Sequence, residues 1–401
     1  MKRIICAILT VTFIMVLAAP AFAKDEEYKD LSEITEREIK NYAINFASEF
    51  DPSVNLEAGR IVPIYNCADI LVGFSVEYYQ EEVPYGFINL NFSYENPVSE
   101  FVINKNAESI FQYLENTVKA ANYEYRIENK LYSTLPLEYY VLATDGSSRK
   151  MYFGTDSKPM AEEDFFDLKE SVVRAHEKAG DYGYFSSGTQ YASHDDLYSD
   201  TYVSGGYVVA GPTLMSKYNS DTSIVKQNYI MQNTGKYACS VVALTAIANQ
   251  ENILTTSVPN TFNVLWTATS TTATGQTYNY NGTSIILGTT QNSNLASAMQ
   301  WYGTLKGKTT STTTSDSPQY SFYTTSVNNN KSSSFSYSIE YFDGSVVGHT
   351  VSVVGYCSVS KSSNIYNYLI CATGWNYDDP MFFDISHVDT VSSYGVRYSF
   401  S

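Results

Sequence analysis

The sequence predicts an α+β protein built from two parts, and three observations support this. Apolar residues recur at helical spacing in some segments and alternate with polar residues in others. Helical and strand patterns are mixed in the first half, whereas strand patterns dominate the end of the chain. Residues 24–200 hold 33 acidic and 15 basic side chains, whereas residues 201–401 hold 9 and 8. A charge shift of this kind indicates a domain boundary near residue 200.

The overall composition excludes several classes of function. The 401 residues carry a formal net charge of −17, and a surface that binds nucleic acid needs clustered Lys and Arg instead. The same charge disfavours docking on anionic lipid. A hydrophobic fraction of 44% is ordinary for a folded chain, so wholesale disorder is not expected.

Residues 1–23 have the pattern of a secretory signal peptide. Lys2 and Arg3 precede an apolar run, and Ala21-Phe22-Ala23 gives a small-x-small cleavage site. The apolar run is short for a membrane span, and no second long run follows it. We therefore expect a secreted, extracellular protein without a membrane span.

Residues 24–180 are expected to form an acidic α+β domain. Thr35 and Glu38 have the spacing of a capping box at the start of the first helix. In the third strand, aliphatic residues alternate with Tyr, Phe and Asn, which places them on one face. The expected helices cover residues 33–49, 107–121 and 162–178, and the expected strands cover residues 61–65, 70–79 and 85–94.

Residues 181–221 are rich in Gly, Ser, Tyr and Asp and predict a linker that is partly extended and open to proteases. Residues 222–401 then form the second domain. Its Ser/Thr/Asn-rich stretch up to about residue 333 is expected to be surface, interrupted by one short helix. The expected helices cover residues 238–249 and 295–302, and the expected strands cover residues 334–341, 349–359, 366–372, 382–385 and 396–400.

Cysteine usage gives no sign of a disulfide scaffold or a metal site. The expected mature chain keeps Cys67, Cys239, Cys357 and Cys371, which is sparse for its length. A Cys357–Cys371 bridge is possible, because both residues fall in neighbouring expected strands. No cysteine or histidine cluster has zinc-ligand spacing, so we expect neither a metal nor a cofactor.

Cys239 is the first candidate for chemistry. It opens the helix expected at residues 238–249, after a polar loop that contains Gly235. Unsatisfied N–H groups and the helix dipole at such a position stabilise a thiolate, the nucleophilic form of cysteine. Gln232 lies seven residues upstream, where its amide could act as an oxyanion donor. Burial as a small apolar residue is the alternative interpretation for a lone cysteine.

His349 is the histidine best placed to pair with Cys239. It shares the apolar face of an expected strand with Val351 and Val353, and a buried imidazole there needs a partner such as a thiolate. The other three histidines fit less well: His176 belongs to an expected helix, His194 to the linker and His387 to an expected surface turn.

The order Gln, Cys on a helix, Gly-His-x-Val-x-Val-x-Gly-Tyr and Gly-Trp375 resembles the papain-like cysteine peptidases. The secreted streptopain and double-glycine-peptidase-like groups are the most similar in layout. The resemblance implies a catalytic Cys on a helix N-terminus packed against an antiparallel sheet, preceded by an α+β propeptide-like domain. It implies that Cys239 is the nucleophile, His349 the general base and acid, and Gln232 an oxyanion-hole donor.

The sequence also departs from that family. The Cys-Gly-Ser-Cys-Trp signature is replaced by Tyr-Ala-Cys-Ser-Val. The position that normally orients the imidazole aligns with Thr373. Asn376 is the preferred third catalytic residue, with Thr373 and Asp378 as alternatives. Gln227 is the alternative to Gln232.

The function expected from these features is a secreted cysteine endopeptidase that acts on protein or peptide substrates. It would be made as a zymogen, with the N-terminal domain as an intramolecular inhibitor and processing in the linker. Three alternatives remain open at this stage. The fold could belong to an inactive adhesion or binding protein, the enzyme could be a cell-wall amidase, or residues 24–180 could be a permanent domain.

Overall fold

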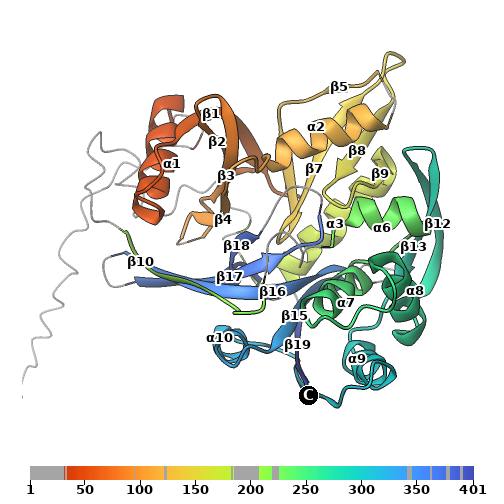
Figure 1. Cartoon of the computed structure of the whole chain (residues 1–401). Coiled ribbons are helices and arrows are strands. Elements are labelled where there is room, and N and C mark those ends of the chain that lie inside the picture. Colours follow the sequence, from red (N-terminus) through yellow and green to blue (C-terminus); the bar gives the residue numbers. More distant parts are fainter. Residues whose placement is uncertain are drawn as a thin grey trace, which may run out of the picture.

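The chain combines helices with a large, mostly antiparallel sheet (Figure 1). The computed structural model describes residues 31, 34–94, 96–121, 124–181, 184, 207–218, 225–340, 346–361, 364–375, 380–388 and 392–401. The helices in this part of the chain are α1 (Glu36–Phe50), α2 (Ile110–Ala120), α3 (Glu162–Ala179), α6 (Gln227–Thr234), α7 (Cys239–Gln250), α8 (Val258–Ala268), α9 (Asn294–Leu305), α10 (Tyr320–Asn328) and the 3-10 helix η4 (Ile385–Val388).

Among the described residues of the N-terminal half, within 31–181, there are nine strands. They are β1 (Glu57–Tyr65), β2 (Leu71–Gln80), β3 (Val83–Asn91), β4 (Val98–Ile103), β5 (Arg126–Ile127), β6 (Leu131–Leu135), β7 (Glu138–Thr144), β8 (Lys150–Gly154) and β9 (Pro159–Ala161). Thr35 and Glu38 form the expected capping box at the start of α1. The buried face of α1 packs against β1 and β2.

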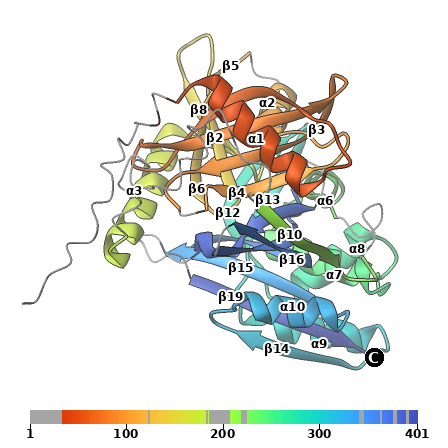
Figure 2. The same cartoon turned by 90° about the vertical axis from the view of Figure 1, so that its left-hand side faces the viewer.

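The C-terminal half, residues 207–401, contains ten strands among the residues described. They are β10 (Tyr207–Leu214), β11 (Lys236–Tyr237), β12 (Thr272–Tyr280), β13 (Thr283–Thr289), β14 (Thr310–Ser315), β15 (Ser332–Glu340), β16 (Val346–Lys361), β17 (Asn364–Ala372), β18 (Met381–Asp384) and β19 (Ser392–Phe400). Figure 2 shows α9, α10 and β14 gathered near the C-terminus.

One sheet runs through both halves. Its order is β14-β19-β15-β16-β17-β18-β4-β3-β2-β1-β6-β7-β8-β9, with β10 paired to β16 and β5 paired to β7. The path passes from one half to the other where β18 pairs antiparallel with β4, Phe382 opposite Phe101 and Phe383 opposite Glu100. A second, three-stranded sheet has the order β11-β13-β12.

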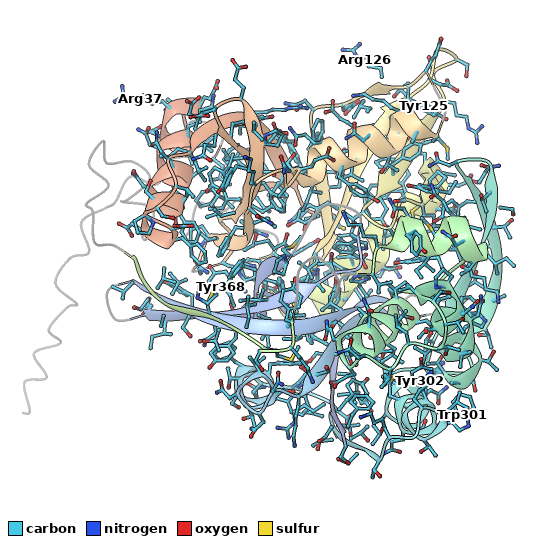
Figure 3. All side chains as sticks on the ribbon, in the orientation of Figure 1. Arg37, Tyr125, Arg126, Trp301, Tyr302 and Tyr368 are labelled. Atoms are coloured by element: carbon cyan, nitrogen blue, oxygen red, sulfur yellow. The ribbon has the colours of Figure 1, made fainter. Side chains whose placement is uncertain are left out.

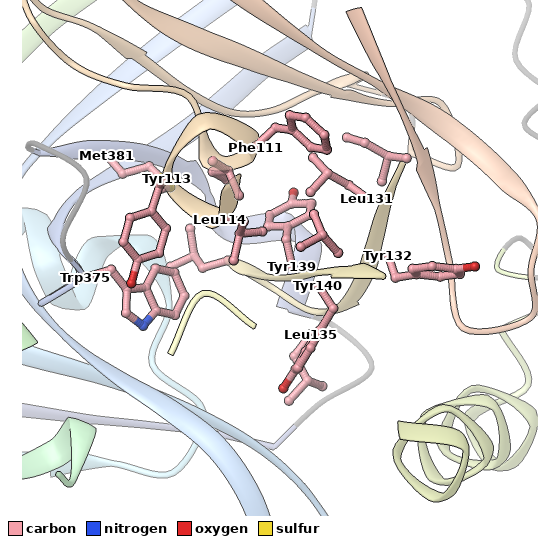
Figure 4. Close-up of a cluster of buried hydrophobic side chains, with 14 of the residues drawn as sticks. Phe111, Tyr113, Leu114, Leu131, Tyr132, Leu135, Tyr139, Tyr140, Trp375 and Met381 are labelled. Atoms are coloured by element: carbon pink, nitrogen blue, oxygen red, sulfur yellow. The ribbon is translucent and has the colours of Figure 1, made fainter. Parts of the chain in front are cut away.

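The apolar interior is also shared between the halves. One buried cluster joins α2, β6, β7 and α3 to residues of β15, β16 and β17 and to Trp375 (Figure 4). A second joins α1 and β2–β4 to Cys357, Val359 and Tyr368. Figure 3 shows Tyr368 among the side chains between the halves. The division at residues 181–221 therefore stays a prediction, because strand pairing and packing continue across it.

Most expected elements are confirmed, to within a few residues at each end. The stretch before residue 333 is not simply surface loop, however, because it contains α8, β12, β13, β14 and α10. β12 is almost wholly exposed, so it has no apolar alternation to reveal it, and its extended form follows from its Thr and Tyr content. Strands β4–β9 and β11 and helix α6 are also not predicted from the sequence.

Two further expectations are wrong. Cys357 and Cys371 are free thiols, because Cys357 lies opposite Tyr368 and Cys371 opposite Val353 in the β16–β17 ladder. His387 is not in a surface turn but is buried in η4, where it stacks on Tyr94 at 3.7 Å between ring centroids. In the part of the chain described, no helix has the length and apolar character to cross a membrane.

The shared core predicts a large cost for truncating Phe335. Its ring is fully buried and lies 5.7 Å from Tyr337 and 5.8 Å from Tyr323 between centroids. Phe335→Ala should lower the free energy of unfolding by about 3–5 kcal/mol, because it leaves a cavity. Phe166 is 52% exposed, so Phe166→Ala should cost about 0.5–1 kcal/mol. Urea unfolding measures both, and equal losses would contradict this packing.

Candidate functional site

Cys239 stands at the N-terminus of α7, as expected from the sequence. The preceding residue, Ala238, has extended backbone and gives the helix no side-chain cap. The first N–H groups of α7 are therefore available to a negative charge close to the sulfur. Cys239 Sγ lies 3.8 Å from the carbonyl oxygen of Gly348, the residue that precedes His349.

Helix α7 lies along one face of β16 through polar contacts. Ser240 Oγ lies 2.7 Å from Thr350 Oγ1, and Gln250 Nε2 donates to Ser352 Oγ at 3.3 Å. Gly348 is needed at the start of this contact, because a Cβ there would lie 2.0 Å from the carbonyl oxygen of Tyr337. The alternation of β16 thus turns Thr350 and Ser352 toward the helix that carries Cys239.

His349 follows Gly348 on β16 and is held by two groups. Its Nε2 donates to the carbonyl oxygen of Thr373 at 3.0 Å. The indole of Trp375 stacks on the imidazole with 4.2 Å between centroids and 17° between planes. Because a carbonyl can only accept, Nε2 carries the proton and Nδ1 is the basic nitrogen of the neutral ring.

Both groups are neutral in this state. Burial lowers the pKa of His349 to about 3, although its bond to Thr373 acts in the opposite direction. Burial also raises the pKa of the Cys239 thiol, and the Glu138 carboxylate adds to that rise. No hydrogen bond joins the sulfur to the imidazole among the described contacts, so the thiolate–imidazolium pair is not formed.

Of the three candidates for the residue that orients the imidazole, the structure describes one. Thr373 orients the imidazole through its backbone carbonyl, while its own Oγ1 accepts the N–H of Trp375 at 3.2 Å. A main-chain carbonyl is present whatever the side chain. This explains how Thr can occupy position 373, where the family normally has an Asn or Asp side chain. Asn376 and Asp378 lie outside the described residues.

The two glutamines also occupy different surroundings. Gln232 is exposed near the end of α6. Gln227, at the start of α6, is buried, and its backbone N–H donates to Gly374 O at 2.7 Å. Its Oε1 is buried without a hydrogen-bond partner among the described residues. Gln227 is therefore tied to the segment that holds His349.

The N-terminal half contacts the C-terminal half at Gln227 and at β12. Gln227 Nε2 donates to the carbonyl oxygen of Asp156, in the turn between β8 and β9. Two residues further along, Lys158 Nζ donates to Gln276 Oε1 of β12 at 3.0 Å. The carboxylate of Asp156 raises the pKa of Tyr237, beside Cys239 in sequence, although burial is the larger cause.

Comparison with known proteins adds no relative. The sequence matches no protein-family model, and it matches no curated protein. The chemistry of the site therefore rests on the geometry described above.

The neutral state predicts slow alkylation of Cys239 in the intact chain. A thiol with a raised pKa forms thiolate only as the pH rises above its ordinary value, so the rate with iodoacetamide should be low at pH 6–8 and still climbing at pH 9. Mass spectrometry of the labelled peptide against pH measures this, with Cys239→Ser as the control. A rate that is already high and constant from pH 6 would indicate a preformed ion pair.

Proposed function

We propose that this chain is the secreted precursor of a papain-like cysteine peptidase, with the N-terminal half as its intramolecular inhibitor. The observation that carries the proposal is the approach of the α7 N-terminus to the strand that presents His349. Cys239 Sγ lies beside the backbone of residue 348, and the next residue is an imidazole whose Nε2 is already bound. Nδ1 is thus the nitrogen left for a thiol proton.

The proposed reaction is acyl transfer. His349 Nδ1 takes the Cys239 proton, and the thiolate attacks the carbonyl carbon of a peptide bond. The N–H groups at the start of α7 and the amide of Gln227 hold the oxyanion. The imidazolium then protonates the leaving amine as the C–N bond breaks. Water hydrolyses the thioester, with His349 as base, and restores the thiol.

Burial supports the assignment of a latent precursor. The N-terminal turn occupies the Gln227 amide. Burial is the main cause that lowers the pKa of His349 and raises the pKa of the half-buried Cys239 thiol, so both groups stay uncharged. Removal of this segment would rehydrate them. The pKa of His349 would then rise, the pKa of Cys239 would fall, and the pair could exchange its proton.

Substitution of the nucleophile tests the proposed activity. Cys239→Ala should abolish casein hydrolysis by the processed protein, because the proposed acyl intermediate forms on the Cys239 sulfur. Cys357→Ala is the matched control, since Cys357 is a free thiol on β16 that the processed protein keeps, and it should leave hydrolysis unchanged. If Cys239→Ala protein digests casein at the wild-type rate, the peptidase proposal fails and a binding role is favoured.

The two glutamines give a second test with an internal control. Gln227→Ala in the processed protein should lower kcat/KM by about 10²–10³-fold, the effect of losing one oxyanion donor. Gln232→Ala, on the exposed side of α6, should change kcat/KM less than about threefold, since substitutions of exposed side chains usually have small effects. The reverse order would restore Gln232 as the oxyanion donor.

A further inference from the structure

We infer that the two halves remain bound to each other after the segment between residues 181 and 207 is cut, so that processing first yields a two-chain protein. The inference rests on the proposed function in one respect: the proposed function is the reason to expect a cut between the halves. It rests on the joint between β4 and β18, which consists of strand pairing, aromatic packing and a buried polar contact.

Strand pairing makes the N-terminal half an extension of the C-terminal sheet. β4 continues into β3, β2 and β1, and β18 continues into β17 and β16. Separation would expose a row of unpaired N–H and C=O groups along each strand. A cut at residues 185–206 removes none of the pairs between Phe382 and Phe101 or between Phe383 and Glu100.

Aromatic side chains fill the joint from both halves. Phe101 stacks on Phe382 with 4.6 Å between centroids and 9° between planes, and Phe50 lies edge-on to Phe382 at 5.1 Å. Tyr368 packs edge-on to Phe101 at 5.4 Å. Phe101 and Tyr368 are fully buried. Interfaces of this apolar kind are typical of permanent complexes rather than of transient contacts.

A buried polar contact fixes the alignment of the joint. Asn96 Nδ2 donates to Asp384 Oδ2 and to Tyr368 Oη, both at 2.6 Å. Tyr368 Oη in turn donates to Val98 O at 2.8 Å. Asn96 and Asp384 are almost inaccessible, so this contact is not weakened by water.

The joint has a consequence for regulation. If the halves stay together, the turn that carries Asp156 stays on Gln227, and the Gln227 amide remains occupied in the cut protein. Cutting the connection is then separate from uncovering Cys239. A second event, such as digestion of the N-terminal half, is required to expose the site.

The experiment uses the full chain with Cys239→Ala, so that its result does not depend on peptidase activity. A recognition sequence for a specific protease replaces part of residues 186–204, and the protein is cut completely. On size exclusion at about 1 μM, below which many transient complexes dissociate, both pieces should elute together at the volume of the intact chain. Elution as two separate peaks would overturn the inference.

A matched pair of substitutions locates the attachment. Asn96→Asp places a second carboxylate against Asp384 and should raise the dissociation constant of the cut protein at least about tenfold at pH 8, because like charges in an interface are unfavourable. Asn116→Asp makes the same change beside Glu108, within the N-terminal half, and should leave the constant unchanged. Equal constants for the two variants would show that the joint does not hold the halves together.

If the Asn96→Asp variant does not fold even before cutting, hydrogen exchange tests the inference without it. The amides of β4 and β18 in the cut Cys239→Ala protein should keep the protection that they have in the uncut protein. Loss of that protection, while β2 and β16 remain protected, would contradict the inference.

Discussion

The alternation of side chains along β16 is the constraint on which the site and both cores depend. β16 pairs with β15, β17 and β10, so its faces cannot rotate. Thr350 and Ser352 meet α7 on one face, while Val351 and Val353 enter the shared core on the other. A shift of one residue would exchange these sets and bury hydroxyls in the apolar cluster. The position of His349 is fixed by the same register.

Burial of the site would keep the proposed precursor inactive in two ways. One is steric, since the turn after β8 occupies Gln227. The other is electrostatic, because a low-dielectric environment penalises the charged forms of Cys239 and His349. The Glu138 carboxyl shows the same penalty, since burial raises its pKa to about 8 and Asp156 adds to the rise. The acidic half therefore supplies Glu138, a carboxyl group that raises the pKa of the thiol, although most of its charge lies elsewhere.

The sequence was sufficient for the elements with strong periodicity. It also indicates Cys239, because a polar loop precedes an apolar helix, and His349, because the other histidines have poorer surroundings. The reactivity of these two residues stays a prediction. Gln227 was only an alternative, since its burial depends on Asp156, 71 residues away in the chain. The β4–β18 joint has no sequence signal at all, because strand partners so far apart are chosen by tertiary packing. β12 was missed for the opposite reason: it is exposed, and nothing buried imposes a period.

The bond from His349 to the Thr373 carbonyl separates the orientation of the imidazole from the identity of the residue that orients it. Every amino acid carries the same carbonyl. The orientation of the imidazole therefore depends on the backbone path after β17 and little on the side chain at residue 373. A search that matches side chains would therefore find Cys239 and His349 and overlook the group that orients the imidazole. Such an arrangement is recognised by tracing main-chain acceptors around the ring, which a comparison of residue types does not do.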